Sequence, residues 1–228
     1  MSRLIPLVKV VITLIISFVP RYAMNSLESS KFPLAGMQLD IQYVLFVLLL
    51  VILIPSCQDM PPVPSAGLVK GSGSFQAGCN LLENMGLLST SDNELLKVLD
   101  PKAYGMLETL RTAASTQNPA SRAIHTIDPS LFPCHAFHFN CQTPTHTDNK
   151  DDPRLWAVVH SFGNYTKGGE FHISTLNLTI PFRPRDTIWL RGNVLEHCIK
   201  PWDGGQRISC ASFVHKSHFS YYKLPFDF

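Results

Sequence analysis

The sequence predicts a mainly β fold with flanking helices, an α+β architecture whose strands form a barrel or sandwich of the jelly-roll or cupin type. Three observations support this. After Pro133, short stretches rich in β-branched and aromatic residues recur at a spacing of about ten residues, separated by turn residues. Two helical patterns precede them, between residues 91 and 114. The chain has 228 residues, enough for one sizeable domain and an extension.

The first sixty residues have a different composition from the rest. Residues 4–19 are mostly apolar and follow Arg3, like the apolar region of a signal peptide or an imperfect anchor. Residues 41–54 are more strongly apolar, and counting from Leu39 to Cys57 brings this segment near the roughly 20 residues that cross a bilayer. We expect residues 1–60 to be a membrane-associating segment, with contact through residues 1–57, or the product of a misassigned gene start. A nuclear location is expected in the second case.

A flexible linker is expected at residues 61–74, because this stretch is rich in Pro, Gly and Ser. The folded domain is therefore expected over residues 75–228. Ser91-Asp92-Asn93-Glu94 matches a capping box and predicts a helix over residues 94–99. Asp100-Pro101 predicts the start of a second helix that ends near Ala114. Both helices are expected to brace a sheet and to carry no chemistry.

The alternation of apolar and polar residues predicts the strands of the β region. In the first strand Phe137 and Phe139 alternate with His138 and Asn140, which gives one packed face and one polar face. The strands are expected at residues 137–142, 156–162, 170–173, 176–181, 187–191, 195–199 and 207–214. In the last of these, Arg207, Ser209, Ala211 and Phe213 share one face, and we expect it to point into the barrel.

Charge and cysteine content exclude some classes of protein. The net charge is +2 and the isoelectric point is about 8.2, so the whole chain has no signature of polyanion binding. Six cysteines at irregular spacing are too few for a disulfide scaffold, and most are expected to be reduced and buried. A zinc site formed by Cys134, His135, His138 and Cys141 is disfavoured, because a strand places these groups on both of its faces.

His146-Thr147-Asp148 is the strongest candidate for chemistry. On an extended segment, residues two apart share a face, so the imidazole and the carboxylate can reach one metal ion. A second imidazole would complete the facial triad of non-haem Fe(II) oxygenases, whose open positions take a co-substrate and O₂. His197 is the best candidate, because Arg207 lies ten residues later and could bind the far carboxylate of a 2-oxoacid. The alternative is a surface histidine beside an aspartate that caps a turn.

Several motifs together resemble the Fe(II)/2-oxoglutarate-dependent dioxygenases, closest to the TET/JBP-like oxygenase group common in fungal genomes. They lie between residues 133 and 218: His146-x-Asp148, Gly168-Gly169-Glu170, Phe182-Arg183-Pro184-Arg185-Asp186, Leu190-Arg191-Gly192, Leu195-Glu196-His197, Pro201-Trp202 and Arg207-x-Ser209. Arg185 departs from the pattern, since the group usually has Gly there, and the apolar N-terminal segments are not a feature of the family.

The resemblance implies a double-stranded β-helix and a set of site residues. His146, Asp148 and His197 would be the Fe(II) ligands, and Arg207 would be the anchor for 2-oxoglutarate, assisted by Ser209. Asn140 and His138 are weaker candidates for contact with the co-substrate or the substrate. The implied reaction is an O₂-dependent hydroxylation of a C–H bond.

The resemblance implies the methyl group of 5-methylcytosine or thymine as the substrate, in a base flipped out of its duplex. Arg183, Arg185 and Arg191 are candidates for phosphate contacts, although they could equally form a solvated face. A membrane-anchored prolyl hydroxylase-like enzyme is the second hypothesis, with possible glycosylation sequons at Asn164 and Asn177. Such enzymes usually have Lys in place of Arg207. A cupin-like binding protein without turnover is the third hypothesis.

Overall fold

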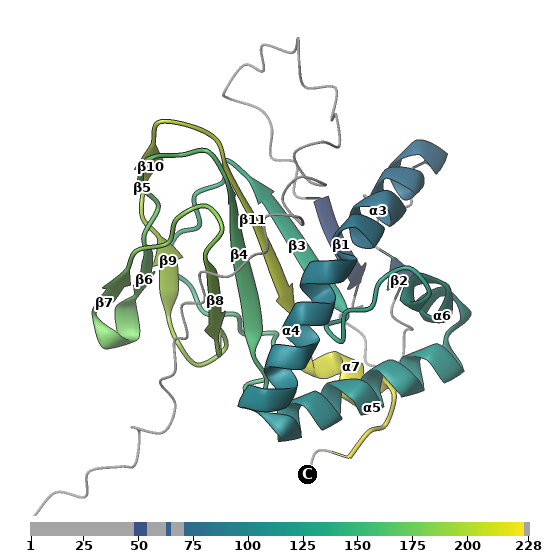
Figure 1. Cartoon of the computed structure of the whole chain (residues 1–228). Helices are drawn as coiled ribbons and strands as arrows, with labels where there is room; N and C mark the ends of the chain where they lie inside the picture. The colour runs from purple at the N-terminus through teal and green to yellow at the C-terminus, as the bar shows by residue number, and fades with distance from the viewer. Residues whose placement is uncertain (1–47, 54–62, 65–70, 226–228) are drawn as a thin grey trace, which may run out of the picture.

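A six-stranded antiparallel sheet lies at the centre of the computed structural model, which describes residues 48–53, 63–64 and 71–225 (Figure 1). The strands are β1 (Leu48–Leu53), β2 (Val63–Pro64), β3 (Cys134–Phe139), β4 (Ala157–Gly163), β5 (Lys167–Gly168), β6 (Phe171–Ile173), β7 (Leu178–Ile180), β8 (Thr187–Leu190), β9 (His197–Ile199), β10 (Trp202–Asp203) and β11 (Arg207–Phe213). The large sheet has the order β2-β1-β3-β11-β4-β8, a small sheet has the order β7-β6-β9, and β5 pairs with β10.

Helices pack on one side of the large sheet, and the small sheet packs on the other (Figure 1). The helices are α3 (Ser72–Asn84), α4 (Gly86–Leu99), α5 (Pro101–Gln117), α6 (Pro119–His125) and α7 (Lys216–Tyr221), and a 3₁₀ turn, η2 (Ser174–Leu176), connects β6 to β7. The expected combination of antiparallel sheets with flanking helices is confirmed. Among the described strands, however, the hydrogen-bonded pairs form separate sheets and do not close into a barrel.

Alternation along β4 and β11 explains why two cores form. Val158 of β4 faces the helices and joins a core with Leu107 and Phe219, whereas Ala157 faces the small sheet and packs with Phe171 and Ile188. Successive side chains of a strand point to opposite faces, so each central strand contributes to both layers. The same alternation turns Arg207, Ser209, Ala211 and Phe213 of β11 toward the small sheet, where they line one cavity, as the sequence predicted.

The helices differ from the predictions in their boundaries. Asp100 begins α5 as expected, and its carboxylate accepts a hydrogen bond from the Ala103 N–H. Helix α4, by contrast, begins at Gly86 rather than at Glu94, so the apparent capping box lies inside a helix. There, the Ser91 hydroxyl donates back to the Leu87 carbonyl oxygen. The first helix of the described residues, α3, begins at Ser72, within the stretch that is expected to be a linker.

Part of the apolar N-terminal region is a strand. Residues 48–53 form β1, which pairs antiparallel with β3 and places Leu48 opposite Phe137. Residues 4–19 and the remainder of the expected anchor lie outside the described residues. Within the part of the chain that is described, no helix combines the length and the hydropathy needed to cross a membrane.

Candidate metal and oxoacid site

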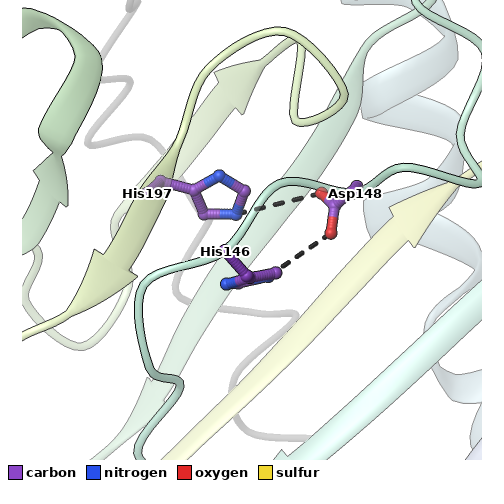
Figure 2. Close-up of side chains that lie close together, drawn as sticks. All are labelled: His146, Asp148 and His197. Atoms are coloured by element: carbon purple, nitrogen blue, oxygen red, sulfur yellow. Dashed lines mark ion pairs between the residues drawn. The ribbon is translucent and has the colours of Figure 1, made fainter.

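The three predicted metal ligands converge at one point between the two sheets. Figure 2 shows the side chains of His146, Asp148 and His197 turned toward one another. His146 Nε2 lies 3.4 Å from Asp148 Oδ1, and His197 Nε2 lies 3.8 Å from Asp148 Oδ2. One ligand atom from each residue lies within 4.8 Å of the other two. Two imidazoles and one carboxylate grouped in this way match the facial triad that binds non-haem iron.

Backbone pairing brings the two ligand-bearing segments together. The His146 N–H donates to the His197 carbonyl oxygen at 3.0 Å, and the His197 N–H donates to the His146 carbonyl oxygen at 2.9 Å. This isolated antiparallel bridge places the two rings with their centroids 4.5 Å apart. On its other side, the His197 ring stacks on the buried ring of Phe171 at 5.3 Å. The relative position of the two imidazoles is therefore fixed by the fold itself.

The ring nitrogens of both histidines are oriented for metal binding. His146 Nδ1 lies 2.8 Å from the Pro144 carbonyl oxygen, and His197 Nδ1 lies 2.8 Å from the Leu195 carbonyl oxygen. A carbonyl oxygen can only accept a hydrogen bond, so Nδ1 carries the proton in each neutral ring and Nε2 keeps its lone pair. Hydrogen bonds of this kind orient metal-binding imidazoles and set their tautomer. Both Nε2 atoms face Asp148.

The protonation states also suit a cation. Burial raises the pKa of the Asp148 carboxyl, but the hydrogen bond that His146 Nε2 donates when its ring is protonated, and the charge of the neighbouring imidazoles, outweigh burial and hold this pKa below its usual value. The hydrogen bond with Asp148 raises the pKa of His146, whereas burial lowers the pKa of His197. The carboxylate is thus ionised at neutral pH. Together, the donor set and its charge fit a divalent metal ion such as Fe(II).

Arg207 lies on the same cavity in a buried position. Only 1% of its surface is exposed, and its guanidinium lies 5.6 Å from the ring centroids of both Phe182 and Trp202. Its Nη1 lies 3.4 Å from the Ser209 hydroxyl, while Nε and Nη2 have no hydrogen-bond partner among the described residues. Burial lowers the pKa of Arg207, and Tyr165 opposes this. The arginine still remains protonated, because a guanidinium is not deprotonated in proteins.

A buried guanidinium with unused hydrogen-bond donors favours the binding of an anion. Burial of an unpaired charge costs several kcal/mol, and a planar guanidinium matches a carboxylate through two parallel hydrogen bonds. Among the described residues that line the cavity, the predicted metal ligand Asp148 and the nearby Asp151 are the only acidic ones. Asp151 pairs with His215 and Asp148 with the histidine ligands. The carboxylate of a bound small molecule therefore fits the free side of Arg207.

The three predicted metal ligands and Arg207 share a cavity of about 450 Å³. This volume is within the range of about 300–1,000 Å³ that is common for small-molecule sites. His138 lines it too, as predicted, opposite Ser209 in the pairing of β3 with β11. Burial and the nearby charge of Arg207 lower the pKa of His138, which favours the neutral form of its ring.

Asn140 is not among the residues that line the cavity. Strand β3 ends at Phe139, and Asn140 has a left-handed backbone with φ of 49°, which breaks the alternation that predicted its direction. Its Oδ1 accepts from the Arg207 N–H at 2.9 Å, and its own N–H donates to the Arg207 carbonyl oxygen at 2.8 Å. Asn140 therefore contacts the backbone of the arginine rather than the cavity.

The three arginines considered for phosphate contacts do not line the cavity either. Arg191 lies against Trp156, 5.1 Å from the ring centroid, and 3.4 Å from the Asp100 carboxylate at the start of α5. Arg183 and Arg185 belong to the turn before β8, where the Arg185 N–H donates to the Ser161 carbonyl oxygen. Among the described lysines and arginines, Lys150 lines the cavity in addition to Arg207.

Sequence reasoning missed a polar pair in the cavity. His215 Nδ1 lies 2.9 Å from Asp151 Oδ1, and the His215 ring meets the Phe213 ring edge-on at a centroid distance of 5.1 Å. All three residues line the cavity. Asp151 lies three residues after the Asp148 ligand, and His215 lies two residues after Phe213 on the strand that carries Arg207. This proximity in sequence to the predicted site residues is the signal that could have identified the pair.

Several solved structures resemble this chain. NgTET1 in complex with 5mC DNA is 19% identical over 68% of this chain and 56% of that chain, with a TM-score of 0.51. The viral collagen prolyl hydroxylase vCPH from Paramecium Bursaria Chlorella virus-1, in a complex with 2OG, is 16% identical over 37% of this chain and 59% of that chain, with a TM-score of 0.30. A truncated form of vCPH gives a TM-score of 0.29, 16% identity, and coverage of 37% and 55%.

These similarities concern the fold. No protein-family model matches the sequence, and no curated protein matches it. The matched region spans little more than half of NgTET1. The similarity of fold to NgTET1 agrees with the resemblance to Fe(II)/2-oxoglutarate dioxygenases of the TET/JBP-like group that was inferred above from sequence motifs.

Proposed function

We propose that this protein is an Fe(II)- and 2-oxoglutarate-dependent dioxygenase that hydroxylates the methyl group of 5-methylcytosine or thymine in nucleic acid. One observation carries the reaction class. The triad of His146, Asp148 and His197 shares one cavity with Arg207, a buried cation whose Nε and Nη2 have no partner among the described residues. A metal site together with a carboxylate anchor is what a metal-chelating 2-oxoacid requires.

The proposal extends to the fold. The large sheet and the small sheet enclose the cavity between them, and we interpret them as the two halves of a double-stranded β-helix. The similarity to NgTET1, with a TM-score of 0.51, supports this interpretation. One of the proposed ligands and the arginine then occupy opposite layers. His197 lies on β9 of the small sheet, and Arg207 lies on β11 of the large sheet.

Each residue has a role that follows from its surroundings. His146, Asp148 and His197 would hold Fe(II) on one face, which leaves the opposite coordination positions free. Bound iron, 2-oxoglutarate and O₂ together supply the oxidising power for hydroxylation of a C–H bond. Arg207 and Ser209 would orient the far carboxylate of 2-oxoglutarate. Phe182 and Trp202 cover the guanidinium and exclude water from that contact, which strengthens it.

The substrate part of the proposal rests on the lining around Phe213. A phenyl ring beside a carboxylate and an imidazole offers a stacking surface, an acceptor and a donor, which are the groups that recognise a flipped base. Asp151 would accept from an exocyclic amino group, and His215 would donate to a ring or carbonyl acceptor. Lys150, on the same lining, is placed to contact a phosphate. The structure of NgTET1 is a complex with 5mC DNA, which is consistent with this substrate class.

The test supplies the full chain with Fe(II), 2-oxoglutarate and either duplex DNA containing 5-methylcytosine or a proline-rich peptide, with product detection by mass spectrometry. We expect oxidised base, formed only when 2-oxoglutarate is present, and none from His146→Ala. DNA binding should weaken with salt, with a log–log slope of about one unit for each phosphate contacted. Hydroxyproline without oxidised base would reject the nucleic-acid substrate and support a protein hydroxylase. Absence of any product that depends on 2-oxoglutarate would favour a binding protein.

A further inference from the structure

We propose that Asn193 is a positioning residue that fixes two carboxylates of the site at once, the metal ligand Asp148 and the substrate-facing Asp151. This inference rests on the proposed function, because it concerns the same site. Asn193 does not line the cavity, so it would act only through the segment that it holds.

The contacts of the Asn193 side chain carry the proposal. Its Nδ2 donates to the Asp148 carbonyl oxygen at 3.0 Å and to the Asp151 carbonyl oxygen at 3.0 Å. A side-chain amide has two N–H hydrogens, and these two contacts use both of them. The Asp151 N–H in turn donates to the Asp148 carbonyl oxygen at 2.9 Å, which closes a turn. Asn193 thus braces both ends of the turn that carries the two carboxylates.

The neighbouring glycine completes the support from the same side. The Asp148 N–H donates to the Gly192 carbonyl oxygen at 2.9 Å. A Cβ atom added at Gly192 would lie 2.0 Å from Asp148 Oδ2 and 3.0 Å from its Cγ, so the carboxylate packs directly against the glycine. The segment Gly192-Asn193 therefore contacts the backbone and the side chain of the metal ligand.

The supporting turn is itself held in place. The N–H groups of Val194 and Leu195 both donate to the Arg191 carbonyl oxygen, at 2.9 and 3.0 Å. The Arg191 side chain lies between Trp156 and the Asp100 carboxylate, which ties the turn to the helical layer. The same turn leads directly into β9 and His197. It thus carries one metal ligand and braces another, so its conformation sets the distance between them.

Cobalt binding tests this role without any reliance on turnover. Co(II) would be titrated into the full-length wild type and into the variants Asn193→Ala, Asn193→Asp and Val194→Ala, with the affinity and the visible d–d spectrum recorded. Asn193→Asp keeps the size of the side chain but replaces the donor with an oxygen that faces two carbonyl oxygens. Val194→Ala is the matched control, because Val194 belongs to the same turn and is exposed. Thermal unfolding of each variant would be measured in parallel.

We expect Asn193→Ala and Asn193→Asp to weaken Co(II) binding about 10-fold or more, as is common when support outside the ligand shell is removed, and to change the d–d bands. Val194→Ala should match the wild type in both measurements. If either Asn193 variant has the same Co(II) affinity and the same d–d spectrum as the wild type, the proposal is wrong, whatever the change in melting temperature. Two results would instead overturn the proposed function, and this inference with it. One is a wild-type protein that binds no Co(II), and the other is Co(II) binding that survives the loss of both His146 and His197.

The second carboxylate gives an independent readout. At saturating Fe(II) and 2-oxoglutarate, Asn193→Ala should raise the KM for DNA containing 5-methylcytosine, because Asp151 loses its brace as well. Val194→Ala should leave that KM unchanged. If Asn193→Ala binds Co(II) more weakly but has the same KM for DNA as the wild type, Asn193 does not position Asp151.

Discussion

The two charged ends of the cavity differ in their exposure to solvent. At the metal end, the side chains of His146 and Asp148 are 35% and 30% exposed, although His197 is 9% exposed. At the other end Arg207 is 1% exposed and packed between aromatic rings. An anion that reaches Arg207 must therefore pass deep into the cavity, whereas a larger partner can approach the metal end from outside. The difference favours a small oxoacid bound inside and a substrate presented at the open end.

The difference in exposure also means that substitutions at the two ends should affect binding free energy in different ways. Loss of an exposed proposed ligand would remove a bond to the metal and would leave no uncompensated charge in the interior. Loss of the buried guanidinium would remove the proposed anchor in a medium of low dielectric, where charge-assisted hydrogen bonds are strong. Metal affinity and 2-oxoglutarate affinity should therefore respond separately to substitutions at the two ends.

The largest effect is expected at the metal end. His146→Ala or His197→Ala should abolish Fe(II) binding, because two remaining ligands do not hold the ion against water. The fold should persist, since both side chains lie on the cavity and their bridge is made by backbone atoms. Calorimetric titration with metal, together with circular dichroism, measures both quantities. Equal metal binding by the double variant would show that the ion binds elsewhere.

Arg207→Ala should reduce the affinity for 2-oxoglutarate and leave metal affinity nearly unchanged. Loss of a charge-assisted bidentate contact in a closed site costs about 2–4 kcal/mol, or roughly 30-fold to 1,000-fold in affinity. Arg207→Lys is the matched variant, because it keeps the charge and loses the planar pair of donors. We expect it to fall between alanine and wild type. An unchanged requirement for 2-oxoglutarate in Arg207→Ala would place the anchor elsewhere and remove the contrast between the two ends.

Gly192→Ala should weaken metal binding by about 10-fold, because the new Cβ would lie 2.0 Å from Asp148 Oδ2 and must displace the carboxylate. The backbone at Gly192 is not left-handed, so the effect comes from contact alone. Gly105→Ala is the control, since a Cβ there meets no atom within 4 Å and lies in helix α5, where alanine is favoured. Metal titrations of both variants make the comparison. Similar affinities in the two would contradict the contact between Gly192 and the carboxylate.

The sequence predicted the site better than it predicted the surrounding helices. Period-two alternation identifies a shared strand face without any tertiary information, so Arg207 and Ser209 could be assigned to the cavity correctly. The convergence of His146, Asp148 and His197 could be inferred because their residue types form a known ligand set. The backbone bridge between His146 and His197 depends on long-range pairing, which a local pattern does not contain.

Local patterns failed where a distant partner decided the structure. Asp92 belongs to the apparent capping box, but its carboxylate instead contacts buried His160 Nε2 at 2.8 Å, which docks helix α4 on the large sheet. The stretch from Gly71 to Ser74 favours a linker by composition, yet helix α3 begins within it, and the buried Leu82 packs that helix on the core. Packing of an apolar face contributes more to helix stability than local propensity does. Asn193 was missed for the same reason, because both of its partners lie more than 40 positions away.

The smallest expected effect concerns the acid stability of the fold, which limits the pH range in which the two ends can be compared. His218 is buried, and burial lowers its pKa from 6.5 to about 4. The folded protein therefore holds this ring neutral while the unfolded chain takes up a proton below pH 6.5, so its contribution to stability is present above pH 6.5 and is lost as the pH falls toward 4. Between pH 7 and pH 5.5 the loss should be about 1 kcal/mol.

The variant His218→Asn tests this contribution. It removes the titration, and its amide can donate to the His215 carbonyl oxygen in place of Nδ1. Urea denaturation of both proteins at the two pH values should show a smaller decrease in the free energy of unfolding for the variant. An equal decrease in both would assign the acid sensitivity to other groups, such as half-buried His125, whose pKa is also lowered to about 4 by partial burial and by Arg111.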